Sequence, residues 1–244
     1  MTAGLLLLLL LASLVPVWFL LPFVLRKLET RRLDDACRHD RTIVLTYDDG
    51  PSPAVSAPLL DLLAEQGAPA TFFVIGKQAC ERPDLIQRLQ RAGHEIANHT
   101  QSHTNAWKVT PWATIRDMRA GQNTLQDLGI RSQLFRPPYG KTTLASLAVR
   151  LLNRLRFAYW TIDTQDSWDR RPVRDILEEI ERKGGGVVLM HDFDHPRRGP
   201  AVGEHLDYLL DLTRQIIELA RRNNMELRRF SDLADRRNRG SATS

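Results

Sequence analysis

The sequence predicts an α/β domain in which seven short strands alternate with helices, preceded by one long apolar helix. Short, β-rich apolar runs recur between helix-length segments throughout residues 41–235. Several of those helix-length segments begin at threonine or proline, and several end at glycine, which are common helix boundaries. Residues 3–25 are almost wholly apolar, long enough for a helix to cross a bilayer. Strands and helices that alternate in this way build either a parallel barrel or a doubly wound sheet.

The N-terminal run at residues 3–25 is predicted to be an uncleaved membrane anchor. A cleavable signal peptide would begin with a charged segment and end at a small-residue cleavage site. Here no Lys or Arg precedes the run, and Pro16, Trp18 and Pro22 lie near its end. Basic residues follow at once, and the positive-inside rule places the following domain in the cytoplasm. One helix before a large domain can override that bias, so both sides of the membrane stay open.

The predicted elements of the domain follow in chain order from their boundary residues. The predicted strands are residues 42–47, 70–74, 95–97, 134–135, 157–162, 187–190 and 225–228. The predicted helices are residues 57–65, 83–92, 111–128, 143–155, 172–183 and 203–223, with a last helical turn at 231–234. Thr110 and Pro111 form a typical helix start, and Gly129 a typical stop. Residues 26–40 are interpreted as a polar stem, and residues 236–244 as a basic, disordered tail.

The composition allows one domain together with an anchor or tail. The chain has 244 residues, a formal net charge of +5 and a hydrophobic fraction of 43%, which is enough for a packed core. Seven arginines gather near the C-terminus: Arg221, Arg222, Arg228, Arg229, Arg236, Arg237 and Arg239. Such a cluster could contact anionic lipid or nucleic acid, but a charged, solubilised terminal helix is commoner, and no nucleic-acid partner is expected. The two cysteines, Cys37 and Cys80, form no metal or redox motif.

Two adjacent carboxylates, Asp48 and Asp49, follow the first predicted strand and precede a Gly-Pro break. Parallel α/β enzymes place their chemistry at the carboxyl ends of the strands. Adjacent residues at a strand end point in different directions, so one carboxylate could hold a metal while the other accepts a proton. Asp, Gly and Pro also favour ordinary turns, and this motif alone does not separate the two interpretations.

Two histidines, His99 and His103, follow the third predicted strand four residues apart. They would share one face of a helix or could converge in a loop. Together with Asp49 they would offer two imidazoles and one carboxylate, a set that suits zinc or another divalent metal with open positions for water. A single His-x-x-x-His pattern is more often a surface feature than a pair of ligands. His94, a few residues earlier, is interpreted as part of a loop.

Charged and aromatic residues that could take part in catalysis or binding also follow the next three predicted strands. In the R-P-P-Y-G segment, Arg136 could orient a carboxylate and the Tyr139 amide could face an oxyanion, although paired prolines also make a rigid connector. Asp166 and Trp168 would suit a carbohydrate, since indole stacks on sugar rings, but a helix-capping loop can look the same. His191 leaves a buried strand and could be an acid or base near neutral pH, or an ordinary core histidine.

These segments together resemble the motifs of the polysaccharide deacetylase family, also called the NodB-homology or carbohydrate esterase family 4 enzymes. The resemblance covers about residues 41–234, and its five motifs stand in the family's order at residues 46–50, 99–103, 136–140, 163–168 and 189–192. Tyr47 replaces a phenylalanine of the first motif. Ser167 separates Asp166 from Trp168, whereas the family places tryptophan directly after the second aspartate. The resemblance implies an α/β fold, a distorted (β/α)7-type barrel.

The resemblance also implies how a metal and a base would be held. Asp49, His99 and His103 would bind one divalent metal ion, usually zinc and sometimes cobalt or nickel. Asp48 would be the general base, paired with Arg136. Such an ion would make hydroxide available near neutral pH.

The remaining motif residues are implied to complete the reaction. His191, with its pKa supported by Asp166, would protonate the leaving amine. The Tyr139 amide would stabilise the oxyanion, and Trp168 would stack on the sugar.

The implied reaction is removal of N-acetyl groups from amino sugars of a polysaccharide or a lipid-linked glycan, by an enzyme anchored in a bacterial inner membrane. Two alternatives keep the fold, since relatives remove formyl groups from lipid-linked sugars or acetyl esters from xylan. A third alternative is a glycan-binding protein without activity. A metal-dependent phosphatase would need more ligands for a two-metal site. The sequence predicts no oligomeric state.

Overall fold

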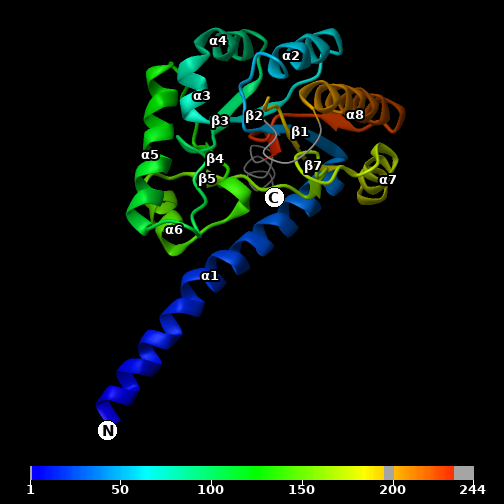
Figure 1. Ribbon diagram of the computed structural model, residues 1–244. Helices are drawn as coiled ribbons and strands as arrows, with labels where there is room; N and C mark the ends of the chain where they lie inside the picture. The colour runs from blue at the N-terminus through cyan, green and yellow to red at the C-terminus, as the bar shows by residue number, and fades with distance from the viewer. Residues whose placement is uncertain (1, 195–200, 234–244) are drawn as a thin grey trace, which may run out of the picture.

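The computed structural model describes residues 2–194 and 201–233, with side chains from residue 17 onward. A curled parallel sheet lies under a layer of helices, and the helix α1 (Thr2–Asp40) extends away from the domain (Figure 1). Among the side chains that are described, no helix is both long and apolar enough to cross a membrane. The predicted anchor falls on α1, but side chains 3–16 lie outside the described residues. The predicted tail at 236–244 lies outside them as well.

The sheet is parallel throughout. Its strands are β1 (Thr42–Asp48), β2 (Thr71–Val74), β3 (Glu95–Asn98), β4 (Leu134–Phe135), β5 (Arg156–Phe157), β6 (Ile162–Asp163), β7 (Gly186–His191) and β8 (Glu226–Leu227). They pair in the order β5-β4-β3-β2-β1-β7-β6, with β8 beside the start of β1. The remaining helices are α2 (Ser56–Glu65), α3 (Gly76–Glu81), α4 (Pro83–Arg91), α5 (Pro111–Asp127), α6 (Leu144–Leu152), α7 (Val173–Lys183) and α8 (Val202–Arg222), with a short 3-10 turn η1 (Pro138–Gly140).

The predicted α/β fold is confirmed, but the sheet differs from the predicted barrel of seven strands in the number of strands and in being open. The predicted strand 157–162 is two short strands, β5 and β6, which stand at opposite ends of the strand order. Ala158 still donates its amide to Phe135 of β4, while Thr161 donates to Val187 of β7. The chain therefore crosses from one edge of the sheet to the other within four residues. Within the described residues no ladder joins these two edges, so the sheet is a half-barrel.

The second half of α1, where a polar stem was predicted, packs lengthwise on the domain. Arg26 Nη1 donates to the carbonyl of Gly140, beyond the carboxyl end of β4, at 2.9 Å. Cys37 is buried inside the curled sheet, and Arg38 Nε donates to the carbonyl of Lys183, just before β7 begins. Consequently α1 runs antiparallel to the strands, from their carboxyl edge to their amino edge.

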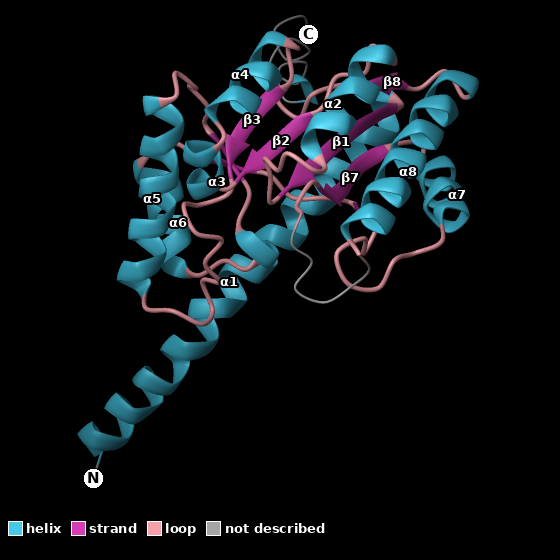
Figure 2. Ribbon diagram, turned by 45° about the horizontal axis from the view of Figure 1, so that its top comes forward, coloured by secondary structure: helices cyan, strands magenta, loops and turns pink. Residues whose placement is uncertain are grey.

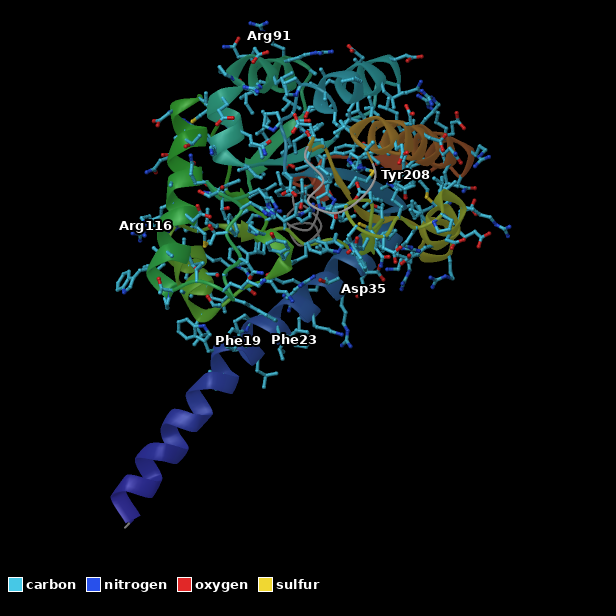
Figure 3. The ribbon with its side chains drawn as sticks, in the orientation of Figure 1. Phe19, Phe23, Asp35, Arg91, Arg116 and Tyr208 are labelled. Atoms are coloured by element: carbon cyan, nitrogen blue, oxygen red, sulfur yellow. The ribbon has the colours of Figure 1, made fainter. Side chains whose placement is uncertain are left out.

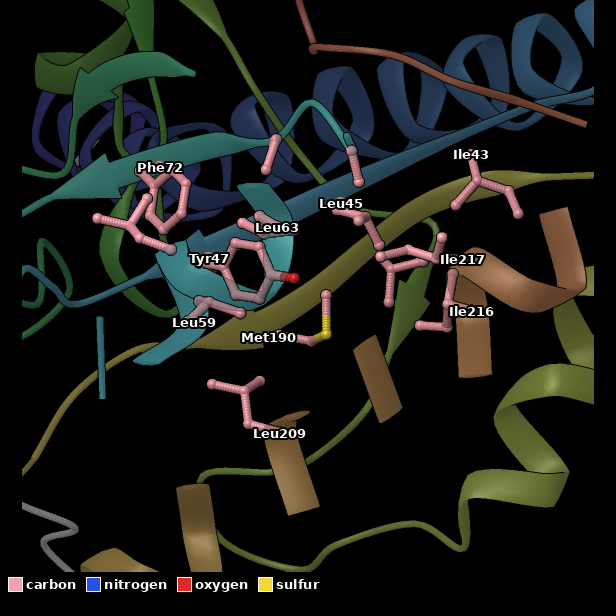
Figure 4. Packing of buried hydrophobic residues seen from close by; sticks show 14 of the residues in the cluster. Ile43, Leu45, Tyr47, Leu59, Leu63, Phe72, Met190, Leu209, Ile216 and Ile217 are labelled. Carbon is pink, nitrogen blue, oxygen red and sulfur yellow. The ribbon is translucent and has the colours of Figure 1, made fainter. Parts of the chain in front are cut away.

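The two faces of β1 explain how its end is positioned. Alternate side chains point to opposite faces of a strand, and Ile43, Leu45 and Tyr47 pack outward against α2 and α8 (Figure 4). The Tyr47 hydroxyl lies 3.0 Å from Thr213 Oγ1 of α8, which further fixes the strand. The alternate set points inward, and its last member, Asp48, is therefore buried at the carboxyl edge inside the curled sheet.

His94, interpreted from the sequence as part of a loop, is buried just before β3. Its ring packs edge-on against Phe72 with the centroids 5.4 Å apart, and neither ring nitrogen has a hydrogen-bond partner among the described residues. Burial lowers the pKa of His94 to about 4. The folded protein therefore holds this imidazole in its neutral form at ordinary pH.

We expect a His94→Leu variant to lose less stability in acid than the wild type. The unfolded chain takes up the His94 proton near pH 6.5, but the folded chain does so only near pH 4. The contribution of His94 to stability is therefore complete above pH 6.5 and is lost as the pH falls through about 4. Urea unfolding at several pH values measures this difference, with the exposed His39→Leu as control. Equal losses in the His94 variant and the wild type would contradict the prediction.

Candidate active site

All of the side chains predicted to act together meet at the carboxyl edge of the sheet. A cavity of about 680 Å³ opens there, and seven of the predicted residues line it: Asp48, Asp49, His99, His103, Tyr139, Trp168 and His191. The other two, Arg136 and Asp166, are buried behind it and contact its lining. Trp160, Asp163 and Phe193 are among the other residues that line the cavity. The cavity is thus assembled from segments that are far apart in the sequence.

Asp49, His99 and His103 form a cluster that could hold one metal ion. Their candidate ligand atoms all lie within 4.8 Å of one another. The Nε2 atoms of His103 and His99 lie 3.1 Å and 3.3 Å from Asp49 Oδ1, and this buried oxygen has no hydrogen-bond partner among the described residues. Two imidazoles and a carboxylate are a common donor set for zinc and similar divalent ions. The residues present therefore fit such an ion.

The hydrogen bonds around this cluster prepare its ligand atoms. Nδ1 of His99 donates to the carbonyl of Arg136 at 2.8 Å, which fixes the ring with its Nε2 facing Asp49. Burial alone would raise the pKa of Asp49, but His103 and His99 hold it well below its usual range. Asp49 is therefore ionised, as a metal ligand must be.

The His-x-x-x-His segment is a loop rather than a helix. The amide of Thr100 donates to the Asn98 side chain, and the amide of His103 donates to Thr100 Oγ1. Asp49, Thr100, His103 and Tyr139 all have φ between 56° and 74°, a left-handed conformation that non-glycine residues rarely adopt. Such backbone strain often gathers at functional sites, and here it turns the two imidazoles toward one carboxylate.

Asp48 is held by a buried arginine. Arg136 is fully buried, and its Nη1 donates both to Asp48 Oδ1 at 2.7 Å and to Thr46 Oγ1 at 2.8 Å. The guanidinium also lies over the ring of Phe73, 3.9 Å from the centroid. Burial lowers the pKa of Arg136, while the charge of Asp48 raises it. This pairing holds Oδ1 of Asp48 in place. The other oxygen, Oδ2, lies 3.7 Å from Nε2 of His99.

His191 is held by both oxygens of one buried carboxylate. Its Nδ1 donates to Asp166 Oδ1 at 2.7 Å, and its backbone amide donates to Asp166 Oδ2 at 2.8 Å. Burial by itself would lower the pKa of His191, but Asp166 outweighs it and raises the pKa to about 10. The imidazole is therefore a charged acid at neutral pH. The extra Ser167 in this motif leaves the contact intact and places Trp168, largely exposed, at the cavity rim.

Two further buried residues beside the site, His205 and Asp192, were not predicted to have a role in it. His205 in α8 donates from Nε2 to the carbonyl of His191 at 2.9 Å, and its ring stacks on Phe193 with the centroids 4.7 Å apart. Asp192 is buried, and burial raises its pKa to about 7, while Ser56 Oγ donates to its Oδ2. No sequence signal could have found His205, because it lies fourteen residues away in a helix without a motif.

Gly50 allows the buried carboxylate of Asp192 to approach the backbone, and we expect Gly50→Ala to be destabilising. A Cβ at this position would overlap the Asp192 carboxyl group. Overpacking of this kind costs about 1–3 kcal/mol, so we expect a matching fall in the free energy of unfolding and a loss of activity. Gly203→Ala is the matched control, because a Cβ there meets nothing within 4 Å. A stable, active Gly50→Ala protein would contradict the predicted clash.

The sequence and the fold both match known proteins. Residues 35–160 match the model of a protein family described as polysaccharide deacetylase. The chitooligosaccharide deacetylase of Rhizobium leguminosarum bv. trifolii is 35% identical over 163 residues, which are 65% of this chain and 75% of that protein.

Two solved structures extend the match to most of the chain. Peptidoglycan deacetylase PdaC from Bacillus subtilis aligns with a TM-score of 0.62 and 27% identity, covering 82% of this chain and 93% of that chain. A family 4 carbohydrate esterase from Streptomyces lividans, in complex with acetate, aligns with a TM-score of 0.59 and 28% identity, covering 72% and 89%. The resemblance inferred from the five motifs is confirmed, and the chain belongs to the polysaccharide deacetylase family.

Proposed function

We propose that this protein is a metal-dependent hydrolase that removes N-acetyl groups from amino sugars of a polysaccharide or a lipid-linked glycan. One observation carries the proposal: a two-histidine, one-carboxylate cluster shares its cavity with the Asp48–Arg136 pair and the Asp166–His191 pair. The relatives support it, since they are named for deacetylation of chitooligosaccharides and peptidoglycan. Acetate, held by one solved relative, is the acid product of such a reaction.

Asp49, His99 and His103 would hold the ion, which we propose to be zinc, with cobalt or nickel as alternatives. When bound, such an ion acidifies water and polarises the acyl carbonyl. The buried Oδ1 of Asp49, without a hydrogen-bond partner among the described residues, and the Nε2 of His99 that faces it support this assignment. The Arg136 carbonyl holds the His99 ring in the orientation that a ligand requires.

In the proposed mechanism, Asp48 is the base and His191 the acid. Asp48 accepts the proton of the attacking water, while the hydrogen bond from Arg136 Nη1 holds its carboxylate in place. The Tyr139 amide would donate to the developing oxyanion, a contribution of about 3 kcal/mol where such donors have been removed. His191 then gives its proton to the departing amine, so the products are acetate and a free amino sugar. Trp168 at the rim would stack on the sugar ring.

The alternatives use the same cavity. Removal of a formyl group or an acetyl ester would need the same base and oxyanion donor, so parallel assays of N-acetyl, N-formyl and O-acetyl substrates distinguish the three reactions. A glycan-binding protein without activity would not need the Asp166–His191 and Asp48–Arg136 pairs. A two-metal phosphatase is disfavoured, because the described residues contain a single three-ligand cluster.

We further propose that residues 3–25 anchor the protein in a membrane, which in a bacterium would be the inner membrane. The apolar sequence of this run supports the proposal, as do the exposed apolar side chains from Val17 to Val24. The basic residues after the run favour the cytoplasmic side. A C-terminal fusion to alkaline phosphatase, compared with one to a fluorescent protein, would determine the side.

Metal removal is expected to abolish activity and to lower thermal stability. Prolonged treatment with a chelator should reduce acetate release by at least about 100-fold, because the ion contributes several kcal/mol to the transition state. One equivalent of zinc per chain should restore both acetate release and the melting temperature, since a ligand that binds only the folded state stabilises it. Asp49→Ala combined with His99→Ala should bind no metal, while the exposed His39→Ala should bind normally. Full activity in the chelated protein or the double variant would exclude this mechanism.

A further inference from the structure

The direction of α1 places its N-terminal half on the same side as the cavity. Arg26 lies at the carboxyl edge of the sheet, beside Gly140, and Arg38 lies at the amino edge, beside Lys183. The helix therefore leaves the domain through the face on which the cavity opens. Figure 2 shows the same relation, because the arrowheads of β1, β2 and β3 point toward the side on which α1 projects.

There is no linker between this helix and the domain. Phe19 still contacts the domain, packing edge-on against Trp107 with the centroids 5.5 Å apart, and Phe23 lies one turn further along α1 at the domain's edge (Figure 3). Both belong to the continuous helix Thr2–Asp40. The domain must therefore lie directly beside the surroundings of the first half of α1, whether these are lipid or water.

The length of α1 then determines how close to the bilayer the domain would lie. At 1.5 Å per residue, residues 3–18 span about 24 Å, which is less than the ~30 Å hydrocarbon core of a bilayer. A spanning helix must therefore use residues up to about Phe23. Since Phe19 packs on Trp107, that tryptophan would have to lie at the level of the lipid headgroups.

The face of the domain around α1 has the side chains that such a position requires. Three tryptophans that follow carboxyl ends of strands are exposed: Trp107 by 44%, Trp112 by 78% and Trp168 by 63%. Lys141 Nζ lies 3.9 Å from the centre of the Trp107 ring, and Lys27 Nζ lies 5.6 Å from that of Phe23. Tryptophan and lysine are the residues that proteins place at the boundary between lipid and water.

We infer that the catalytic face of this domain rests on the surface of a lipid bilayer, with its cavity open toward the headgroups. The inference depends on the membrane anchor proposed above. It deepens the proposed function, because a cavity in this position would favour a sugar carried by a lipid in the same bilayer over a distant soluble glycan. Trp107 and Trp112 are the predicted membrane contacts, and neither belongs to the proposed catalytic machinery.

Site-specific fluorescence of the full chain tests this placement. In a Cys80→Ser background, where Cys37 is buried, Trp112→Cys would carry a nitrobenzoxadiazole probe on the catalytic face. Arg131→Cys is the matched control in the exposed loop before β4, at the amino edge. The protein would be reconstituted in phosphatidylcholine–phosphatidylglycerol vesicles that contain lipids with a nitroxide at headgroup level. We expect the probe at position 112 to lose at least about half of its fluorescence and the probe at 131 to keep it. Equal quenching, quenching only at 131, no quenching at either position, or failure to float with the vesicles would overturn the inference.

An activity assay separates this inference from the proposed reaction. Trp112→Ser should lower hydrolysis of an N-acetylglucosaminyl lipid in the vesicles by about fivefold, and should leave hydrolysis of soluble chito-oligosaccharide unchanged. Equal effects on the two substrates would contradict docking on the bilayer and leave the deacetylase proposal standing. Absence of hydrolysis of either substrate by the wild type would contradict the deacetylase proposal, while the quenching result would still decide the placement.

Discussion

Asp48→Asn is expected to lower kcat/KM for an N-acetylated chito-oligosaccharide by about 10²–10⁴-fold, the usual contribution of a positioned proton acceptor. Asparagine keeps the shape of the side chain and can still accept the hydrogen bond of Arg136 Nη1. It cannot take a proton from water. Because Asp49, His99 and His103 are unchanged, one equivalent of zinc should still bind. The measurement is acetate release combined with metal analysis of the purified variant.

The stability of the same variant must be measured alongside its activity. Asp48→Asn leaves the buried guanidinium of Arg136 without a charged partner, and breaking such a pair costs about 3–5 kcal/mol. Circular dichroism and thermal unfolding would show that the protein assayed is folded. Asp163→Asn is the matched control. The Asp163 carboxylate also lines the cavity, but it accepts a hydrogen bond from the backbone amide of Gln165 and has no proposed role in the reaction. A similar loss in both variants would argue against a special role for Asp48.

Much of the fold could be predicted because its strands are short apolar runs between clear helix boundaries. Thr110 does cap α5, accepting from Ala113 as its position before Pro111 predicted. The split between β5 and β6 could not be predicted, since residues 157–162 are an apolar and aromatic run interrupted only by Thr161. Such a run does not show which strands its two ends pair with. The packing of residues 26–40 was missed for a similar reason, because Cys37 is buried and Leu33 half-buried only through contacts with distant segments.

In the candidate site, too, residues near strand ends could be predicted, but contacts between distant segments could not. Asp48, Asp49, His99 and His103 could be predicted, because they lie at the carboxyl ends of β1 and β3 or in the loops that follow, and all parallel strands end at one edge. The sequence could not supply the contacts that adjust these groups. The support of His191 by His205, and the near-neutral pKa that burial gives Asp192, depend on elements that come together only in the folded domain.

Asp166→Asn is expected to make activity depend steeply on alkaline pH. In the wild type, Asp166 raises the pKa of His191 to about 10 although burial opposes it, so the acid stays protonated through the neutral range. Without that carboxylate, burial is opposed only by the charges of Asp49 and Asp48, and the pKa should fall toward the ordinary histidine value of about 6.5. The protonated fraction then drops about tenfold for each pH unit above the new pKa. We expect kcat/KM of the variant to stay within about tenfold of wild type near pH 6 and to fall by about 100-fold or more near pH 9.

Substrates with different leaving groups distinguish a loss of the acid role of His191 from a general disturbance of the cavity. Asp166 also accepts the backbone amide of His191, so a purely structural defect in Asp166→Asn would lower activity equally at every pH and for every substrate. An aryl acetate releases a phenolate that needs no proton from His191. If the acid role is correct, Asp166→Asn should hydrolyse the aryl ester at nearly the wild-type rate and with an unshifted alkaline limb, and His191→Asn should do the same. Equal loss on amide and ester would instead assign Asp166 to holding the loop, and the acid would have to be sought elsewhere in the cavity.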